Sequence, residues 1–199
     1  HKHQVMKFQR LFIKKKIYGE IKYELTSRED AWVELARYTC NELWNEFLNY
    51  IEIIFSIIDA RIQFSLTEHV KAAILANKNE YSTHLKESLV KTLVMAKCFY
   101  SEYSPLNMID NCVYRILNSI NDVKEWADLS KYINDLTEAA PELVLKKYEK
   151  SMFKNSGFVA LFNVEEDFIF GKNYYCEYMF SLEQLLQQEL YVKRTLKIL

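Results

Sequence analysis

The sequence predicts an all-α protein: a multi-helix array of antiparallel helix pairs, either an α-solenoid of the tetratricopeptide-repeat type or an irregular bundle. Two compositional observations and one pattern support this prediction. The 199 residues include 3 glycines and 2 prolines, where average usage would give roughly 14 and 10. Strands need tight turns, and tight turns need these residues, so their scarcity favours helices. Half of the residues are apolar and 15% are aromatic, which is enough for a folded core.

The supporting pattern is the recurrence of apolar residues every three or four positions, which is the spacing of one helix face. Ser27 and Ser82 stand where helix N-caps are expected, and Ser104-Pro105 predicts a cap followed by proline at the first helical position. Residues 158–170 are aromatic-rich and irregular, and their type stays open. The expected helices cover residues 5–18, 27–51 with a break near 39–41, 67–76, 82–100, 105–120, 122–136, 141–148, 175–188 and 190–199.

We expect roughly eight to ten helices with short connections, grouped in pairs of about 35–40 residues as in degenerate α-solenoids. The sequence begins with His1-Lys2-His3 and ends on an amphipathic run from Leu190 to Leu199. We therefore expect a single helical domain, residues 1–199, that is a fragment of a longer chain. His1 and His3 are interpreted as fragment-end residues rather than as metal ligands.

Composition and charge exclude several function classes. The glycines Gly19, Gly157 and Gly171 lie far apart, so no glycine-rich loop can hold a phosphate, and we expect no nucleotide cofactor. The net charge is −1, with 26 basic and 27 acidic residues, which does not favour nucleic-acid binding. No apolar stretch approaches the roughly 20 residues of a membrane span. We expect a cytoplasmic protein without a membrane partner.

Two groups of residues have competing interpretations. The run Lys14 to Lys16 could form a local anion or nucleic-acid patch, but such runs usually form the solvated face of a helix, here a terminal one. The cysteines lack the spacing of a zinc site. We expect them to be buried free thiols in a reducing compartment; they are Cys40, Cys98, Cys112 and Cys176.

The sequence shows no catalytic apparatus. Arg61 and His69 could act as the phosphate-stabilising and proton-transferring groups of a small helical ribonuclease of the HEPN type. Seven residues separate them, however, and a helix cap is expected at Thr67 between them. The acidic run from Glu165 to Asp167 could bind a hard cation, but a solvated loop is the simpler interpretation. We predict no catalytic, cofactor-binding or metal-binding residues, with the Arg61–His69 ribonuclease as the alternative.

Several stretches resemble a known family. They are Asn77 to Leu89 (NKNEYSTHLKESL) followed by Thr92-Leu93, then Leu136 to Glu142 (LTEAAPE), Phe170-Gly171, and Phe180 to Leu185 (FSLEQL). Their order and spacing resemble the C-terminal helical half of large bacterial STAND-type NTPases of antiphage defence. The resemblance covers about residues 27–199. The family pattern has tryptophans near FSLEQL where this chain has other residues, so the contacts of those tryptophans are not transferred.

The resemblance implies a helical-repeat sensor whose nucleotide site and effector lie outside this segment. We therefore predict a non-catalytic scaffold or recognition segment of a bacterial antiviral defence protein. Its partner would be another protein or neighbouring domains of the same chain. Candidate contact residues are exposed aromatics such as Phe168, Tyr174 and Tyr175, although these side chains could equally belong to the core. A stand-alone helical adaptor or immunity protein is a further alternative.

Overall fold

The structure, a computed structural model, describes residues 12–17, 19–59, 62, 81–98, 105–152, 157–162 and 174–199. Within these ranges the chain is mostly helical and holds one two-stranded hairpin. The strands and α-helices are β1 (Phe12–Ile17), β2 (Glu20–Leu25), α2 (Arg28–Leu35), α3 (Asn41–Ser56), α5 (Thr83–Cys98), α6 (Leu106–Ser119), α7 (Val123–Leu129), α8 (Ile133–Ala139), α9 (Pro141–Met152), α10 (Gly157–Leu161), α11 (Tyr174–Leu186) and α12 (Val192–Thr195). Short 3-10 helices, η1 (Ala36–Tyr38) and η6 (Ser130–Tyr132), follow α2 and α7.

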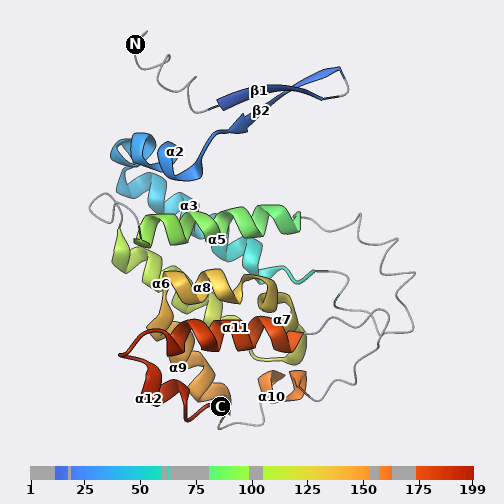
Figure 1. The fold of residues 1–199 in the computed structure, drawn as a ribbon, viewed down its shortest axis with the longest axis vertical. Helices are drawn as coiled ribbons and strands as arrows, with labels where there is room; N and C mark the ends of the chain where they lie inside the picture. Colours follow the sequence, from blue (N-terminus) through green and yellow to red (C-terminus); the bar gives the residue numbers. More distant parts are fainter. Residues whose placement is uncertain are drawn as a thin grey trace.

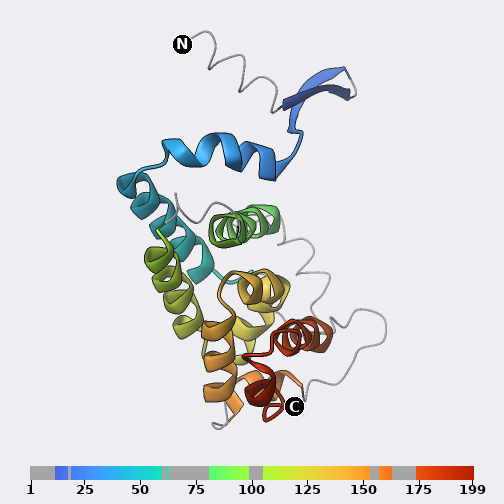
Figure 2. The same cartoon turned by 60° about the vertical axis from the view of Figure 1, so that its left-hand side comes forward.

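The helices stack in two layers (Figures 1 and 2). In one layer α3 packs against α6, and α6 packs against α9; in the other α5 packs against α8, and α8 packs against α11. Helices of the two layers contact each other in turn, as α3 does with α5 and α8 with α9. Figure 2 shows the second layer nearly end-on, with α5, α8 and α11 above one another. This arrangement confirms the predicted all-α array.

One continuous core lies between the layers, because each long helix buries the apolar face that its spacing predicts. Part of this core is an aromatic cluster of fully buried side chains, Trp126, Tyr148, Phe158 and Tyr178, which come from α7, α9, α10 and α11. The ring centroids of Trp126 and Phe158 are 4.7 Å apart, and those of Phe158 and Tyr178 are 5.2 Å apart. Trp126 and Trp44 are buried in this core, while Trp32 is only partly buried.

The predicted helix starts are largely confirmed. The Ser27 hydroxyl accepts a hydrogen bond from the Asp30 amide at 3.1 Å, and Ser82 accepts one from the Leu85 amide at 3.1 Å. Asp122 forms a capping box with Glu125 at the start of α7. Pro105 occupies the N-cap of α6 rather than its first position.

The predicted helix over 122–136 is interrupted by η6. The Ser130 hydroxyl donates to the carbonyl of Ala127 at 2.7 Å, and this backbone bonding competes with regular helix at the junction of α7 and α8. The predicted terminal helix over 190–199 also contracts, to the four residues of α12 flanked by turns.

The prediction of a helix over 5–18 is wrong for its described part. Residues Phe12–Ile17 form β1, which pairs antiparallel with β2 so that Lys15 faces Lys22. The turn needs a residue with a left-handed backbone, and Gly19 supplies it with φ of 86°. In β2, apolar and charged residues alternate from Glu20 to Leu25, which is the strand period. Residues 5–11, the other part of the prediction, lie outside the described residues.

The cysteines are free thiols as predicted, but the expected burial is wrong for three of them. Cys112 is buried, and its thiol lies 3.7 Å from the carbonyl of Leu48. Burial raises the pKa of Cys112 to about 12. Cys40, Cys98 and Cys176 are exposed because they lie at helix ends or on the first turn of α11. No helix in the described ranges is long and apolar enough to cross a membrane.

Candidate functional site

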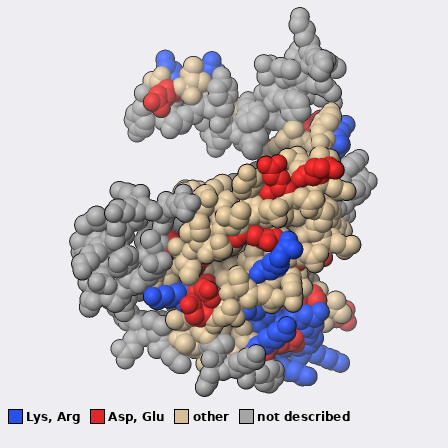
Figure 3. All heavy atoms as spheres, turned by 180° about the vertical axis from the view of Figure 1, so that it is seen from behind, with Lys and Arg blue, Asp and Glu red and all other residues tan. Residues whose placement is uncertain are grey.

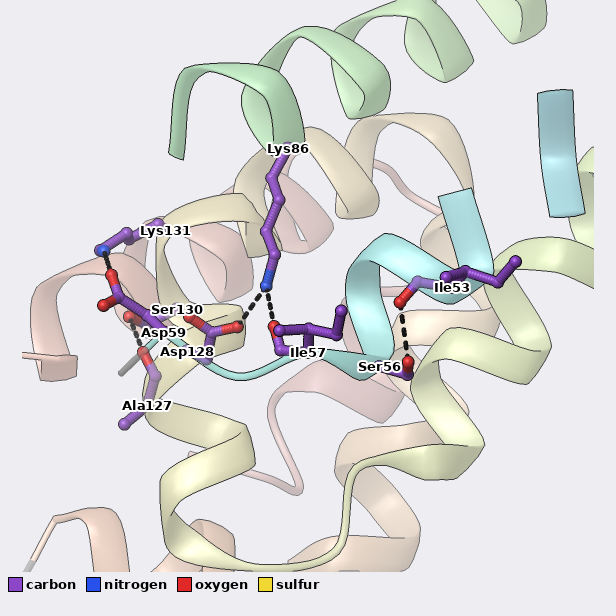
Figure 4. A network of polar contacts seen from close by, with 9 residues as sticks. All are labelled: Ile53, Ser56, Ile57, Asp59, Lys86, Ala127, Asp128, Ser130 and Lys131. Atoms are coloured by element: carbon purple, nitrogen blue, oxygen red, sulfur yellow. Dashed lines mark hydrogen bonds and ion pairs between the residues drawn. The ribbon is translucent and has the colours of Figure 1, made fainter. Parts of the chain in front are cut away.

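A buried ion pair lies where α5 meets α7 (Figure 4). The Lys86 ammonium is 2.8 Å from an oxygen of Asp128, and the two side chains are 6% and 8% exposed. Lys86 also donates to the carbonyl of Ile57 just after α3, and it lies over the Phe55 ring at 5.5 Å from the centroid. One lysine therefore joins α5, α7 and the end of α3. The second oxygen of Asp128 is buried without a hydrogen-bond partner among the described residues.

A second ion pair extends this cluster. Lys131 of η6 lies 3.3 Å from the buried carboxylate of Asp59, which follows α3. Tyr174 at the start of α11 lies close by: burial raises the pKa of its hydroxyl, and the charges of Asp59 and Asp128 raise it further. The cluster thus gathers groups from both layers of the array.

The arrangement of this cluster is that of a structural junction. Each lysine has a carboxylate partner, and the bonds run between elements that are far apart in sequence. Buried ion pairs of this kind contribute little net stability but are costly to break, because the remaining charge stays in a low-dielectric interior. We therefore assign the Lys86–Asp128 pair to maintaining the array rather than to chemistry on a substrate.

A different feature lies on the outer side of α3. Leu43, Tyr50 and Ile53 are 51%, 55% and 52% exposed. Together with Glu46 they follow the spacing three, four, three, which places them in one row along the helix. We call these four residues the α3 stripe. The opposite side of α3 forms the core through Trp44, Leu48, Ile51 and Phe55.

The stripe points away from the neighbouring helix of its layer. Glu52 of α3 bonds Arg115 of α6 at 2.5 Å, so the side of α3 that carries Glu52 faces α6. Tyr50 is two positions from Glu52, which turns it about 200° around the helix axis. The three apolar side chains of the stripe, with Glu46 between them, are therefore accessible on a side of α3 that faces away from α6.

Most residues considered for chemistry from the sequence are not among those that the structure describes. Arg61, His69, Thr67 and the acidic run 165–167 lie outside the described residues. Among the described residues, no group of three or more His, Cys, Asp or Glu side chains could hold a metal ion.

The aromatic residues predicted as contact candidates differ in their positions in the structure. Phe168 lies outside the described ranges, and Tyr174 packs partly against the core. Tyr175 is half exposed, with its ring against Phe162 at 5.6 Å between centroids. Phe158, from the same aromatic-rich stretch, is fully within the core.

The α3 stripe was not predicted from the sequence. Residues 41–56 contain two apolar sets, and only one of them can face inward. The sequence does contain a signal for the stripe, namely the second apolar set. In that set Leu43 and Tyr50 are seven residues apart, and Ile53 follows Tyr50 by three. A helix that is apolar on two sides indicates either complete burial or a docking surface.

Comparisons with protein-family models, with curated proteins and with solved structures found no match for this chain. The resemblance to STAND-type NTPases stays a prediction that rests on sequence motifs. Of those motifs, Glu138 to Pro141 lies at the junction of α8 and α9, where one helix ends and Pro141 opens the next.

Proposed function

We propose that this chain is a non-catalytic scaffold segment that binds a protein partner through the α3 stripe. The observation that carries the proposal is the exposure of Leu43, Tyr50 and Ile53 in a row on a helix whose other side forms the core. Apolar side chains gain free energy when a partner removes them from water. Three such side chains gathered on one side of a helix are therefore more typical of an interaction surface than single, scattered ones are.

The chemistry of the stripe favours a helical partner with basic residues. Apolar residues at this spacing interlock with an amphipathic helix laid along α3. Tyr50 offers a ring and a hydroxyl, and tyrosine is enriched among residues that dominate binding energy. Glu46 lies within the row and Glu42 next to it, both exposed. Lysine or arginine beside the apolar residues of the partner would complement these carboxylates.

The wider context in this proposal comes from the sequence motifs. The chain would serve as a helical-repeat segment of a larger bacterial defence protein located in the cytoplasm, and a two-layer helical array is an architecture suited to that role. The complete coding region of the natural protein tests this part. A phosphate-binding loop upstream of this segment is expected, and its absence would contradict membership in a STAND-type NTPase.

The binding proposal can be tested with a designed peptide. We would titrate the chain with an amphipathic helical peptide of about 20 residues, with leucines at heptad spacing and lysines beside them, and follow binding by calorimetry. A peptide of the same composition in scrambled order serves as the control ligand. Saturable binding of the amphipathic peptide, and none of the scrambled one, is the expected result.

Matched variants locate the binding site. Tyr50→Asp and Ile53→Asp place a charge in the stripe and should each weaken binding by at least about tenfold. Asn45→Asp adds the same charge at an exposed position of α3 outside the stripe and should leave binding nearly unchanged. Equal binding of the two peptides, or equal effects of the three substitutions, would refute the proposal.

A further inference from the structure

The β1–β2 hairpin projects from the array beyond α2 (Figures 1 and 2). Its strands pair with each other over six residues, and among the described residues it makes no extensive contact with a helix. Figure 3 shows its basic and acidic atoms at the upper end of the molecule, apart from those of the helices. A lone two-stranded sheet is marginally stable in water, and a third strand adds stability. The hairpin is therefore a candidate for the addition of another strand.

The two outer edges of the hairpin differ in chemistry. Within the described ranges, no further strand pairs with the outer edge of either strand. β1 contains the consecutive lysines Lys14 to Lys16, and lysines on an edge strand are a common protection against unwanted pairing. β2, from Glu20 to Leu25 (EIKYEL), instead alternates charges of both signs with apolar residues. The outer edge of β2 is therefore the one suited to another strand.

The sequence of β2 is complementary to itself in one antiparallel register. In this register Tyr23 lies opposite Tyr23 of a second copy. Lys22 then lies opposite Glu24, and this pair occurs twice because the arrangement is symmetric. Ile21, which is 54% exposed, lies opposite Leu25. Opposite charges and apolar residues that face each other across antiparallel strands stabilise the pairing.

Neighbouring registers are less favourable. A slip of two residues in one direction places Lys22 opposite Lys22 and Glu20 opposite Glu24. The same slip in the other direction places Glu24 opposite Glu24. Like charges directly across from each other are destabilising. A slip of one residue sets the charged residues of one copy against the apolar residues of the other.

We propose that β2 pairs antiparallel with β2 of a second copy of this chain, which joins the two hairpins into one four-stranded sheet. The inference goes beyond the proposed function, because it uses a different surface from the α3 stripe. The same residues serve on both copies, so the assembly closes at two. One pair of short strands is small beside the roughly 1,200–2,000 Å² of stable interfaces. The dimer should therefore be weak and depend on concentration.

Sedimentation velocity of the full chain, at concentrations up to about 1 mM, tests the proposal. The wild type should show a monomer–dimer equilibrium. Lys22→Glu and Glu24→Lys each place like charges across the contact twice, so each variant alone should be monomeric. An equimolar mixture of the two should dimerise again, because every exchanged charge then meets its opposite. Lys16→Glu makes the same change of charge on β1, outside the contact, and should dimerise like the wild type.

The hairpin itself should tolerate the key substitution. Lys22 lies opposite Lys15 within the hairpin, so Lys22→Glu replaces a pair of like charges by a pair of opposite ones. Loss of the dimer in this variant would therefore report on the contact between copies and not on unfolding of the hairpin.

Disulfide cross-linking tests the register. In a chain whose exposed cysteines Cys40, Cys98 and Cys176 are replaced by serine, Tyr23→Cys should form a cross-linked dimer under mild oxidation. The two copies of position 23 lie directly opposite, within the Cα distance of about 4.4–6.8 Å that a disulfide spans. Ile21→Cys is the matched control, because its two copies would lie four residues apart along the strands, roughly 14 Å.

Three results would each overturn the inference. The first is a wild type that stays monomeric at every concentration, and the second is a mixture of Lys22→Glu and Glu24→Lys that stays monomeric. The third is a dimer that Lys16→Glu weakens as strongly as Lys22→Glu does. Binding of the designed peptide to the α3 stripe is measured separately, so the proposed function and this inference stand or fail independently.

Discussion

Two networks of charged side chains hold the array together, one in its interior and one at its C-terminal end. The Lys86–Asp128 pair joins α5, α7 and the end of α3, with both side chains more than nine-tenths buried. Arg194 of α12 binds the carboxylates of Glu142 and Glu149 of α9, and we call this group the Arg194 clamp; all three side chains are about one-third exposed. The bonds are of similar length, 2.7 to 2.8 Å.

The two networks differ in whether water can solvate a charge that has lost its partner. If one partner of the clamp is removed, the other charge is already partly hydrated and loses little. If one partner of the buried pair is removed, the remaining charge must stay in the interior or the packing around it must open. The cost of removing one partner is therefore set by the burial of the pair and not by the length of its bonds.

The largest effect is expected from breaking the buried pair. Lys86→Met leaves the Asp128 carboxylate unpaired and should lower the free energy of unfolding by about 3–5 kcal/mol. The double variant Lys86→Met, Asp128→Leu removes both charges and should recover most of this loss. Urea denaturation followed by circular dichroism measures both values. A single variant that costs less than the clamp variant described below would contradict the ranking by burial.

A substitution at Gly157, where α10 closely approaches α7, should have the next largest effect on stability. A Cβ atom at Gly157 would lie 2.2 Å from backbone atoms of Asp122 and Val123, so α10 and α7 must separate to admit it. Gly157→Ala should therefore cost about 1–3 kcal/mol or more. Gly19→Ala is the matched control, because its positive φ strains alanine although no atom lies within 4 Å. A larger loss for Gly19→Ala in the same denaturation experiment would show that α10 adjusts freely.

Removal of the clamp should have a smaller effect. Arg194→Ala loses a bidentate and a single carboxylate contact at a partly hydrated site, and should cost about 1 kcal/mol. Arg115→Ala is the control, since it loses one pair with Glu52 at a more exposed position and should cost about half as much or less. Thermal unfolding of the two variants compares them. Equal losses would show that the clamp gains nothing from its geometry.

The smallest effect is the pH dependence of the clamp. The Arg194 guanidinium lowers the pKa of Glu149 below its ordinary 4.5. Burial raises the pKa of Glu142, but hydrogen bonds from Arg194 and Lys146 outweigh this and lower it. A carboxylate whose pKa falls on folding stabilises the fold above its unfolded pKa. This contribution is lost as pH falls through the folded pKa.

The wild type should therefore be more stable than Arg194→Ala at neutral pH. This difference in the free energy of unfolding should shrink as pH falls below the ordinary carboxyl pKa of 4.5. Denaturation curves at several acidic pH values measure this gap. A gap that stays constant or widens with acid would contradict the assignment.

The sequence signals that worked were local ones. Ser27 and Ser82 could be identified as caps because a cap and its helix are neighbours in sequence. The hairpin was missed because the run Lys14 to Lys16 hides the alternation in β1. The Lys86–Asp128 pair could not be foreseen, since its partners are 42 residues apart and meet only in the folded array.

The α3 stripe is an intermediate case. Its apolar residues are visible in the sequence, but deciding which of two apolar sets faces the core requires the neighbouring helices. Trp44 and Leu48 face inward because they pack into the core that α3 forms with α5 and α6. Leu43 and Tyr50 are then left on the outside.

The most direct test of the account is hydroxyl-radical footprinting of the chain with and without the amphipathic peptide. Tyr50 and Tyr114 are 55% and 48% exposed, so their oxidation rates in the unbound chain should be similar. With peptide bound, the account predicts strong protection of Tyr50 and an unchanged rate at Tyr114. Equal protection of the two tyrosines, or protection of Tyr114 alone, would contradict the claim that the α3 stripe is the binding surface.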